Sequence, residues 1–108
     1  MSLYMTQLAY TSEAWTTLAR NPEDRSVAVR GLAVSLGGHL ISFHYSFGEY
    51  DGVIIYEAPD DSAAATIALA AASAGHLKTI KTTTLLTVED TMEVLRRTDE
   101  ITYRGPIE

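Results

Sequence analysis

The sequence contains no cysteine. Disulfide bonds, thiolate catalysis and zinc–thiolate sites are therefore excluded, and a reducing, cytoplasmic compartment is expected. Basic residues are also few, since 8 Lys and Arg stand against 14 Asp and Glu and give a formal net charge of −6. Nucleic acids and anionic membranes are bound by clustered basic side chains, so we expect neither as a partner.

Long hydrophobic runs are missing as well. The longest apolar stretch, within 63–74, is rich in alanine. It falls short of the ~20 strongly apolar residues that a membrane-spanning helix needs, and the start of the chain shows no signal-peptide pattern. The length of 108 residues and the apolar content of 46% fit one domain with one core. We expect this domain to occupy residues 1–97 and a C-terminal arm to occupy residues 98–108.

An aromatic and β-branched region in the middle of the chain predicts the centre of the fold. Residues 39–47 and 53–57 are both rich in the residue types that favour strands, and the short segment 48–51 joins them. Gly48 supplies the conformational freedom that a turn needs. We therefore predict a β-hairpin over 39–57, with a tight turn at 48–51.

The flanking segments predict helices and two further strands. Asn21 and Pro22 suit the N-cap and the first position of a helix that Gly37 and Gly38 end. The predicted elements are strands 3–10 and 77–87, a short helix that begins at Thr11 or Ser12, and helices 22–36, 62–74 and 89–97. This β-α-β-β-α-β order with an extra C-terminal helix predicts a ferredoxin-like α+β domain with a four-stranded antiparallel sheet.

Both faces of the predicted sheet carry apolar side chains, but its helices can cover only one face. The odd positions of strand 39–47 are all bulky, namely Ile41, Phe43, Tyr45 and Phe47. Both sides of 53–56 are apolar as well. An exposed apolar patch of this size is unusual in a monomer. We therefore expect a homodimer in which two sheets pack face to face.

Four motifs stand in order along the chain. They are Gly37-Gly38, Gly48-Glu49-Tyr50-Asp51, Glu57-Ala58-Pro59-Asp60-Asp61 and Thr82-Thr83-Thr84-Leu85. Together they resemble the GYD-domain family of small bacterial proteins, over roughly residues 4–95. The resemblance implies a ferredoxin-like domain of the dimeric α/β-barrel type, and it implies no particular reaction. His44 departs from the family, which often has tyrosine there, and extra residues around Lys78 and Thr79 predict a bulge or a longer approach to the last strand.

Three side chains near the hairpin turn are candidates for chemistry. The Tyr50 phenol and the Asp51 carboxylate can bind or protonate a ligand at the sheet edge. The alternative, which turn chemistry favours, is that Asp51 accepts backbone N–H bonds while Tyr50 packs. His44 lies mid-strand, and histidine suits acid–base catalysis near neutral pH. Its alternative role is a hydrogen-bonded position under a helix or at a dimer seam.

Aromatic residues elsewhere predict a cleft between the sheet and its helices. Trp15 and Tyr45, together with Tyr4 and His44, are expected to line it. Clefts of this kind bind substrates in other dimeric α/β-barrel proteins, such as small cofactor-free monooxygenases and lactone isomerases, which is an analogy of fold only. The alanine-rich helix 62–74 predicts tight packing and therefore a small cleft. Trp15 is equally compatible with a plain core position.

These observations leave more than one function open. The leading hypothesis is an uncharacterised GYD-type module that binds a small molecule or assembles through its sheets. Its predicted ligand-binding residues are Trp15, His44, Tyr45, Tyr50 and Asp51. The alternative is a cofactor-free enzyme, monooxygenase- or isomerase-like, in which His44 shuttles a proton and Tyr45 or Tyr50 orients a small aromatic or lactone-like substrate. We expect no cofactor and no metal, because the three histidines are spread along the chain without metal-binding spacing.

Overall fold

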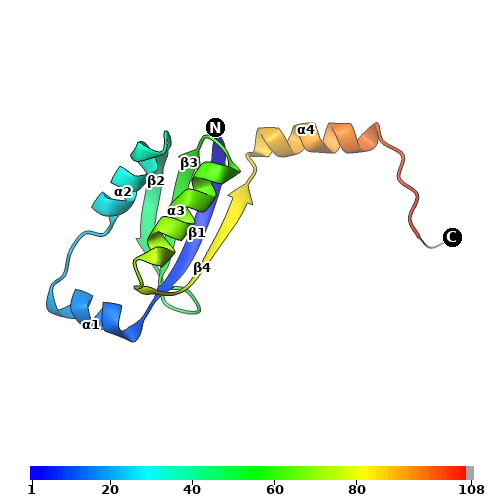
Figure 1. Cartoon of the computed structure of the whole chain (residues 1–108). Coiled ribbons are helices and arrows are strands. Elements are labelled where there is room, and N and C mark those ends of the chain that lie inside the picture. Colours follow the sequence, from blue (N-terminus) through cyan, green and yellow to red (C-terminus); the bar gives the residue numbers. More distant parts are fainter. Residues whose placement is uncertain (107–108) are drawn as a thin grey trace.

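A computed structural model describes residues 1–106 of the chain. Four antiparallel strands form one sheet in the spatial order β2-β3-β1-β4 (Figure 1). The elements are β1 (Ser2–Tyr10), α1 (Ser12–Arg20), α2 (Ser26–Ser35), β2 (His39–Tyr45), β3 (Gly52–Ala58), α3 (Asp61–Ser73), β4 (Leu77–Leu85) and α4 (Val88–Asp99). The predicted α+β fold, with its ferredoxin-like arrangement and extra C-terminal helix, is confirmed.

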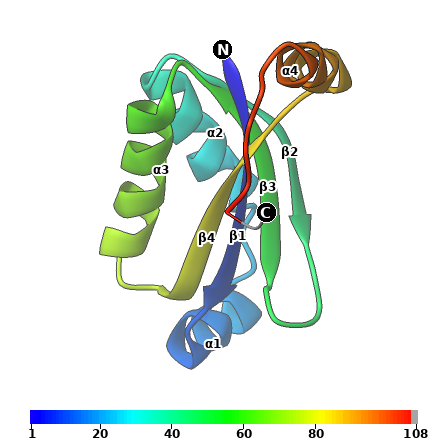
Figure 2. The ribbon, with the colours of Figure 1, turned by 90° about the vertical axis from the view of Figure 1, so that its right-hand side faces the viewer.

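The register of the sheet separates a covered face from an open face. Tyr4 of β1 lies opposite Tyr56 of β3, and Thr6 lies opposite Ile54, so these side chains share the face that carries α2 and α3 (Figure 2). The buried core forms on this face and consists of Tyr4, Leu8, Ala33, Ile54, Tyr56, Ala58, Ala64 and Ile67. The alternate positions of the same strands point to the opposite face, over which no described segment packs.

Two buried tyrosines are tied into the core by hydrogen bonds. The rings of Tyr4 and Tyr56 stack with centroids 5.7 Å apart. The Tyr56 hydroxyl is 3.0 Å from the Thr6 hydroxyl, which lies 2.9 Å from that of Thr82 on β4. The Tyr4 hydroxyl donates to Asp61 Oδ1 at 2.6 Å, and this bond raises the pKa of Tyr4 above its ordinary value. The core therefore contains several hydroxyl groups where its strands meet, and each of these has a hydrogen-bond partner.

The second helix begins later than predicted. Residues 22–25 are not helical, and α2 starts at Ser26. The cause is Asp24, whose Oδ1 accepts bonds from the Ser26 backbone N–H (2.9 Å) and the Ser26 hydroxyl (2.5 Å). This local turn competes with helix formation from Asn21. The segment from Asn21 to Arg25 is consequently a loop that crosses one end of the molecule.

The end of α2 agrees with its prediction. Gly37 has a φ of +83°, and the Gly38 backbone N–H donates to the carbonyl of Ala33 at 2.9 Å. This left-handed glycine followed by a bond to the last helical turn is a Schellman arrangement. A Cβ built on Gly38 would lie 2.0 Å from the carbonyl oxygen of Glu57, so the chain passes β3 too closely for any side chain at that position.

The hairpin differs from its prediction in detail. β2 ends at Tyr45 and β3 begins at Gly52, so the connection is the six-residue loop 46–51 and not a tight four-residue turn. The register shifts between Leu40 and Ser42 on β2, which leaves Ile41 as an extra residue. A second shift on the β1–β4 pair leaves Lys78 unpaired, which confirms the bulge predicted there.

The last helix lies apart from the rest of the fold. β4 ends at Leu85 and α4 runs from Val88 to Asp99, two residues beyond its predicted end, without a single buried residue. It leaves the sheet on the side of the open face (Figure 1). Residues 107–108 of the predicted arm lie outside the described residues. Among the residues described, no helix combines the length and apolar character needed to cross a membrane.

Candidate functional site

Asp51 ties the hairpin loop to the end of the first strand. Its Oδ2 atom accepts a bond from the Tyr10 backbone N–H at 2.9 Å and another from Trp15 Nε1 at 3.1 Å. The Asp51 backbone N–H donates to the carbonyl of Leu8 at 2.7 Å, and its own carbonyl accepts from the Ser46 N–H at 2.8 Å. The Asp51 carboxylate therefore accepts a backbone N–H, but this N–H belongs to β1 and not to the turn as the structural interpretation predicted.

An aromatic cluster surrounds this corner. The Trp15 ring meets the Tyr10 ring edge-on at 5.2 Å and lies 6.5 Å from the Tyr45 ring. Tyr45 in turn lies 5.2 Å from Phe43. Trp15 is 40% exposed and Tyr45 is 52% exposed, so the cluster is a surface feature with one buried side. Tyr10 and Phe43 form the inner part of the cluster, on the covered face of the sheet.

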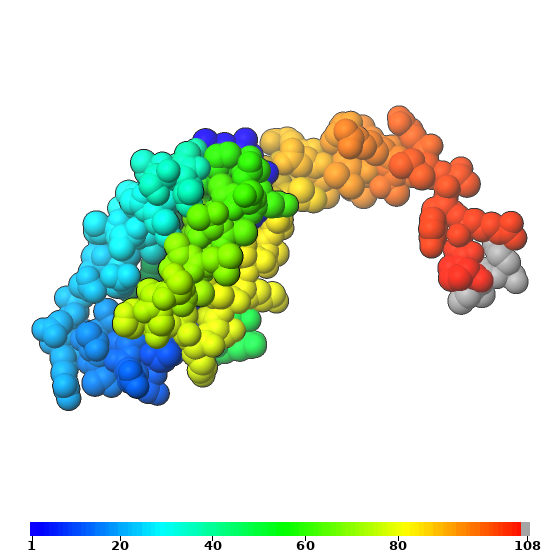
Figure 3. All heavy atoms as spheres, viewed as in Figure 1, coloured from blue at the N-terminus to red at the C-terminus, as the bar shows by residue number. Residues whose placement is uncertain are grey.

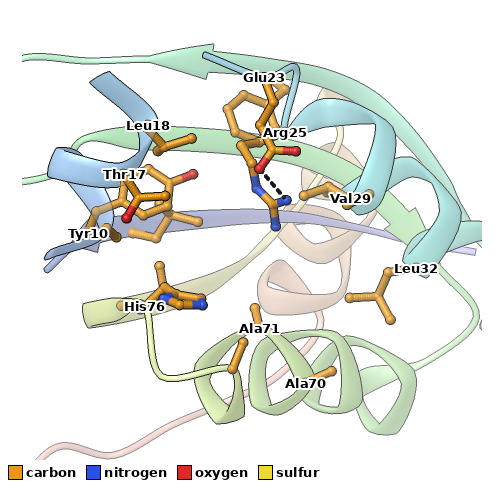
Figure 4. A pocket seen from close by; sticks show the side chains of 16 residues that line it. Tyr10, Thr17, Leu18, Glu23, Arg25, Val29, Leu32, Ala70, Ala71 and His76 are labelled. Carbon is orange, nitrogen blue, oxygen red and sulfur yellow. Dashed lines mark hydrogen bonds and ion pairs between the residues drawn. The ribbon is translucent and has the colours of Figure 1, made fainter. Parts of the chain in front are cut away.

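A cavity opens directly behind this cluster, between α2 and α3 on the covered face. Its volume is about 460 Å³, within the range of roughly 300–1,000 Å³ that is usual for small-molecule sites. Figure 4 shows the side chains around it. The apolar part of the wall consists of Leu8, Ala14, Leu18, Ala28, Val29, Leu32, Phe43, Ala70, Ala71, Ala74 and Leu77.

The alanines of α3 explain why this space exists. In the first half of the helix, Ala64 and Ile67 are buried against the sheet. In the second half, Ala70, Ala71 and Ala74 face the cavity, where no large side chain extends from α3 to fill it. The tight packing expected from the alanines therefore applies only to the first half of the helix. Small side chains give close packing where α3 touches the sheet, and they leave a hollow where its C-terminal half lines the cavity.

The polar groups of the cavity gather at one end. They belong to Tyr10, Thr17, Glu23, Arg25 and His76. The Arg25 side chain reaches down into the cavity from the loop above it (Figure 4). Its Nη1 atom is 3.4 Å from Glu23 Oε1, and both side chains are partly exposed, so this ion pair is weak and can be exchanged for another anion.

Burial raises the pKa of the Tyr10 phenol above its ordinary value, and the neighbouring Tyr45 phenol adds to this while Arg25 partly opposes it. Tyr10 is therefore protonated at neutral pH and can donate a hydrogen bond. The polar end of the cavity therefore holds the Arg25 cation with its weakly paired Glu23 carboxylate, and Tyr10 as a neutral donor. This arrangement can hold a carboxylate or a similar anionic group.

None of the five residues predicted for ligand binding is among the side chains that line the cavity. Trp15, Tyr45 and Asp51 come together at the aromatic cluster, next to the cavity wall that Tyr10 and Phe43 form. Tyr50 is half-buried in the loop, where its carbonyl accepts a bond from the Ser46 hydroxyl at 2.7 Å. His44 is exposed and pairs with Val53 on the open face, on the side of the sheet away from the cavity.

Sequence reasoning missed the polar end of the cavity. The helix predicted over 22–36 included Glu23 and Arg25, which instead lie in the loop before α2, and no ligand role was predicted for His76. The available signal was Asp24 followed two residues later by Ser26, a pattern typical of a side-chain turn that delays a helix. Within residues 1–106, no group of three or more His, Asp or Glu side chains is arranged to hold a metal ion.

Fold and cavity together define a small ferredoxin-like α+β domain with a ligand-sized hollow between its sheet and helices. The chain belongs to the GYD domain family, because the model of that family matches residues 4–95. The resemblance inferred from the sequence motifs is thereby confirmed. No curated protein and no solved structure matches the chain.

Proposed function

We propose that this GYD domain binds a small molecule with an apolar body and an anionic end in the cavity between α2 and α3. The observation that carries the proposal is the cavity of about 460 Å³, apolar over most of its wall and polar at one end. In proteins, small-molecule sites have this combination of an apolar hollow and a few convergent polar groups. The Arg25 cation reaches into the cavity, whereas its partner Glu23 is the more exposed of the two side chains, and this favours an anionic group that replaces Glu23 over a cationic one.

The ligand's position follows from the wall. Its apolar body would lie against Val29, Leu32 and the alanines of α3, while its anionic group would meet the Arg25 guanidinium and displace the carboxylate of Glu23. Tyr10 would donate a hydrogen bond beside it. Asp51 and Trp15 would position Tyr10 without contacting the ligand, because Asp51 binds the Tyr10 backbone N–H and Trp15 packs on the Tyr10 ring.

A titration followed by NMR tests this proposal with three probes of one size. Phenylacetate carries an anionic end, phenylacetamide a neutral one and phenethylamine a cationic one. We expect phenylacetate to bind most tightly and to shift the backbone amide signals of Ala70, Ala71 and His76. Arg25→Gln should weaken phenylacetate about tenfold, because it removes one charge-assisted contact at a partly exposed site.

Ala71→Leu tests the same proposal by filling the cavity. Leucine at position 71 fills part of the cavity and should abolish binding of all three probes. Ala65→Leu makes the same change on an exposed position of α3 and is the matched control. Equal binding to both variants would contradict the cavity as the site, and binding of the amine above the acid would contradict the proposed ligand chemistry.

We also propose that two copies associate through the open face of the sheet in the bacterial cytoplasm. Leu3, Met5, Val53 and Ile55 are apolar and only partly exposed on that face, and Ile41 beside them is 51% exposed. The described part of the C-terminal arm supports this, since Ile101 and Tyr103 remain exposed and do not cover the face.

Sedimentation equilibrium tests the dimer. Ile55→Glu places a carboxylate in the middle of the proposed interface and should give a monomer with an unchanged circular dichroism spectrum. Leu69→Glu makes the same kind of change on the outer side of α3, where the side chain is already 68% exposed, and should leave the dimer intact. A monomeric wild-type chain at 100 μM would contradict the proposal.

A further inference from the structure

α4 carries apolar side chains that its own chain does not cover. Val88, Met92 and Leu95 are 80%, 47% and 57% exposed. Their spacing of four and three residues places them on one stripe of the helix, because an α-helix turns about 100° per residue. A short helix with an apolar stripe is stabilised chiefly by packing that stripe against another surface. No described residue of the domain supplies such a surface.

The stripe is also turned away from its own sheet. A groove of about 350 Å³ lies in the corner where α4 leaves the domain, and Leu3, Ile41 and Leu85 form part of its wall. The helix contributes Asp90 to that wall. Asp90 lies about 160° around the helix from both Val88 and Met92. Only Leu86 and Thr87 separate β4 from α4, which limits how far the helix can be turned onto its own sheet.

The overall dimensions show that the chain is less compact than a single domain of its length. The radius of gyration of the Cα atoms is 17.5 Å, and the longest extent is 60 Å against 33 and 21 Å for the others. A compact chain of this length has a radius of gyration of about 13 Å. Figure 3 shows the reason, which is that α4 and the following residues extend from the domain and enclose a hollow beside it.

The length of α4 matches what lies beyond the open face in the proposed dimer. Packed sheets lie roughly 10 Å apart, and the 12 residues of α4 span about 18 Å at 1.5 Å per residue. The helix is therefore long enough to pass the partner's sheet and reach its helical layer. One chain thus carries an uncovered sheet face and an uncovered helix stripe on the same side, which is the self-complementary arrangement that a twofold dimer uses.

We propose that α4 is an exchanged arm, which buries the stripe of Val88, Met92 and Leu95 on the second copy of the chain while the second copy's arm does the same in return. This inference rests on the proposed dimer and adds to it a contact that the sheet face alone does not provide. The surface that covers the stripe belongs to a second GYD chain and not to another kind of protein.

A matched pair of double variants tests the arm. Met92→Gln with Leu95→Gln removes apolar contact from both arms, which withdraws four side chains from the dimer and should raise its dissociation constant about 100-fold or more. Glu93→Gln with Arg97→Gln changes two exposed polar positions outside the stripe, keeps the net charge, and should leave the dissociation constant within about threefold. Sedimentation equilibrium measures both, and circular dichroism confirms that each variant is folded.

Photo-crosslinking shows where the arm lies. A benzoylphenylalanine at position 92 is irradiated in dimers mixed from ¹⁵N-labelled and unlabelled chains, and the linked peptides are identified by mass spectrometry. We expect links between labelled and unlabelled chains. Links within one chain only, or a dissociation constant that the stripe variant leaves unchanged, would overturn the exchanged arm while the sheet-face dimer stands. A monomeric wild-type chain would overturn both, and neither result touches the cavity.

Discussion

Replacing Asp51 with alanine removes the acceptor that joins the hairpin loop to β1 and α1. Two bonds are lost, from the Tyr10 backbone N–H at 2.9 Å and from Trp15 Nε1 at 3.1 Å. The Tyr10 bond is partly buried and charge-assisted, so its loss costs about 1.5 kcal/mol, whereas the exposed indole N–H can turn to water and costs about 0.5 kcal/mol. We expect Asp51→Ala to lower the free energy of unfolding by about 2 kcal/mol.

Asp51→Asn separates the charge from the geometry. Both bonds end on the same oxygen, Oδ2, so an amide oxygen in that position can accept both without the carboxylate charge. The expected cost is about 1 kcal/mol, half that of alanine. Trp15→Phe removes only the exposed bond and should cost less than either, apart from small changes in packing against Tyr10.

Urea unfolding at one fixed protein concentration measures these differences. Circular dichroism follows all variants, and the fluorescence of Trp15, the chain's single tryptophan, follows those that retain it. The melting temperature of Asp51→Ala should fall by about 8 °C. Unchanged stability of Asp51→Ala would refute the bonding role. If that variant also lost phenylacetate binding, Asp51 would be a ligand residue and not a positioning residue.

Two further predictions follow from the core and from the helix end. Gly38→Ala should destabilise the domain by about 1–3 kcal/mol, because the new Cβ would meet the Glu57 carbonyl oxygen at 2.0 Å. The control is Gly31→Ala in the exposed interior of α2, where nothing lies within 4 Å, and it should be neutral or stabilising. An equal loss of stability in both variants would contradict the close approach of Gly38 to β3. Stability should fall as pH rises above about 10, because the bond to Asp61 raises the pKa of Tyr4 in the folded state, and the folded chain then holds its proton more tightly than the unfolded chain. Tyr4→Phe should flatten this fall in unfolding experiments between pH 9 and 11, and an unaltered slope would show that Tyr4 is not the group responsible.

The order of the elements could be predicted because local signals mark most of their boundaries. Thr11 caps α1 by accepting the Ala14 N–H at 3.1 Å, and Gly37 ends α2 in the left-handed conformation, as both residue types do in short peptides. These two caps depend on neighbours in the sequence, so a single sequence contains them. The irregularity near Lys78 was expected from the resemblance to the family, and the register of β1 and β4 shows it as a bulge.

The site depends on contacts between distant segments, and most of it could not be read in advance. Trp15, Tyr45 and Asp51 were predicted by residue type, but that Asp51 binds the Tyr10 N–H depends on a loop meeting a strand 41 residues away. The cavity arises because the alanine half of α3 faces a loop that had been assigned to a helix. His44 was placed with the cluster on residue type alone, whereas the strand register turns it to the open face.

Native mass spectrometry with added phenylacetate, and a denaturing control, tests the central claim most directly, because it reports assembly and ligand binding in one spectrum. We expect a particle of two chains that gains the mass of phenylacetate in wild-type protein, loses it on denaturation, and gains none in Ala71→Leu. A particle that takes up no phenylacetate, or takes it up equally in Ala71→Leu, would contradict the cavity between α2 and α3 as the binding site.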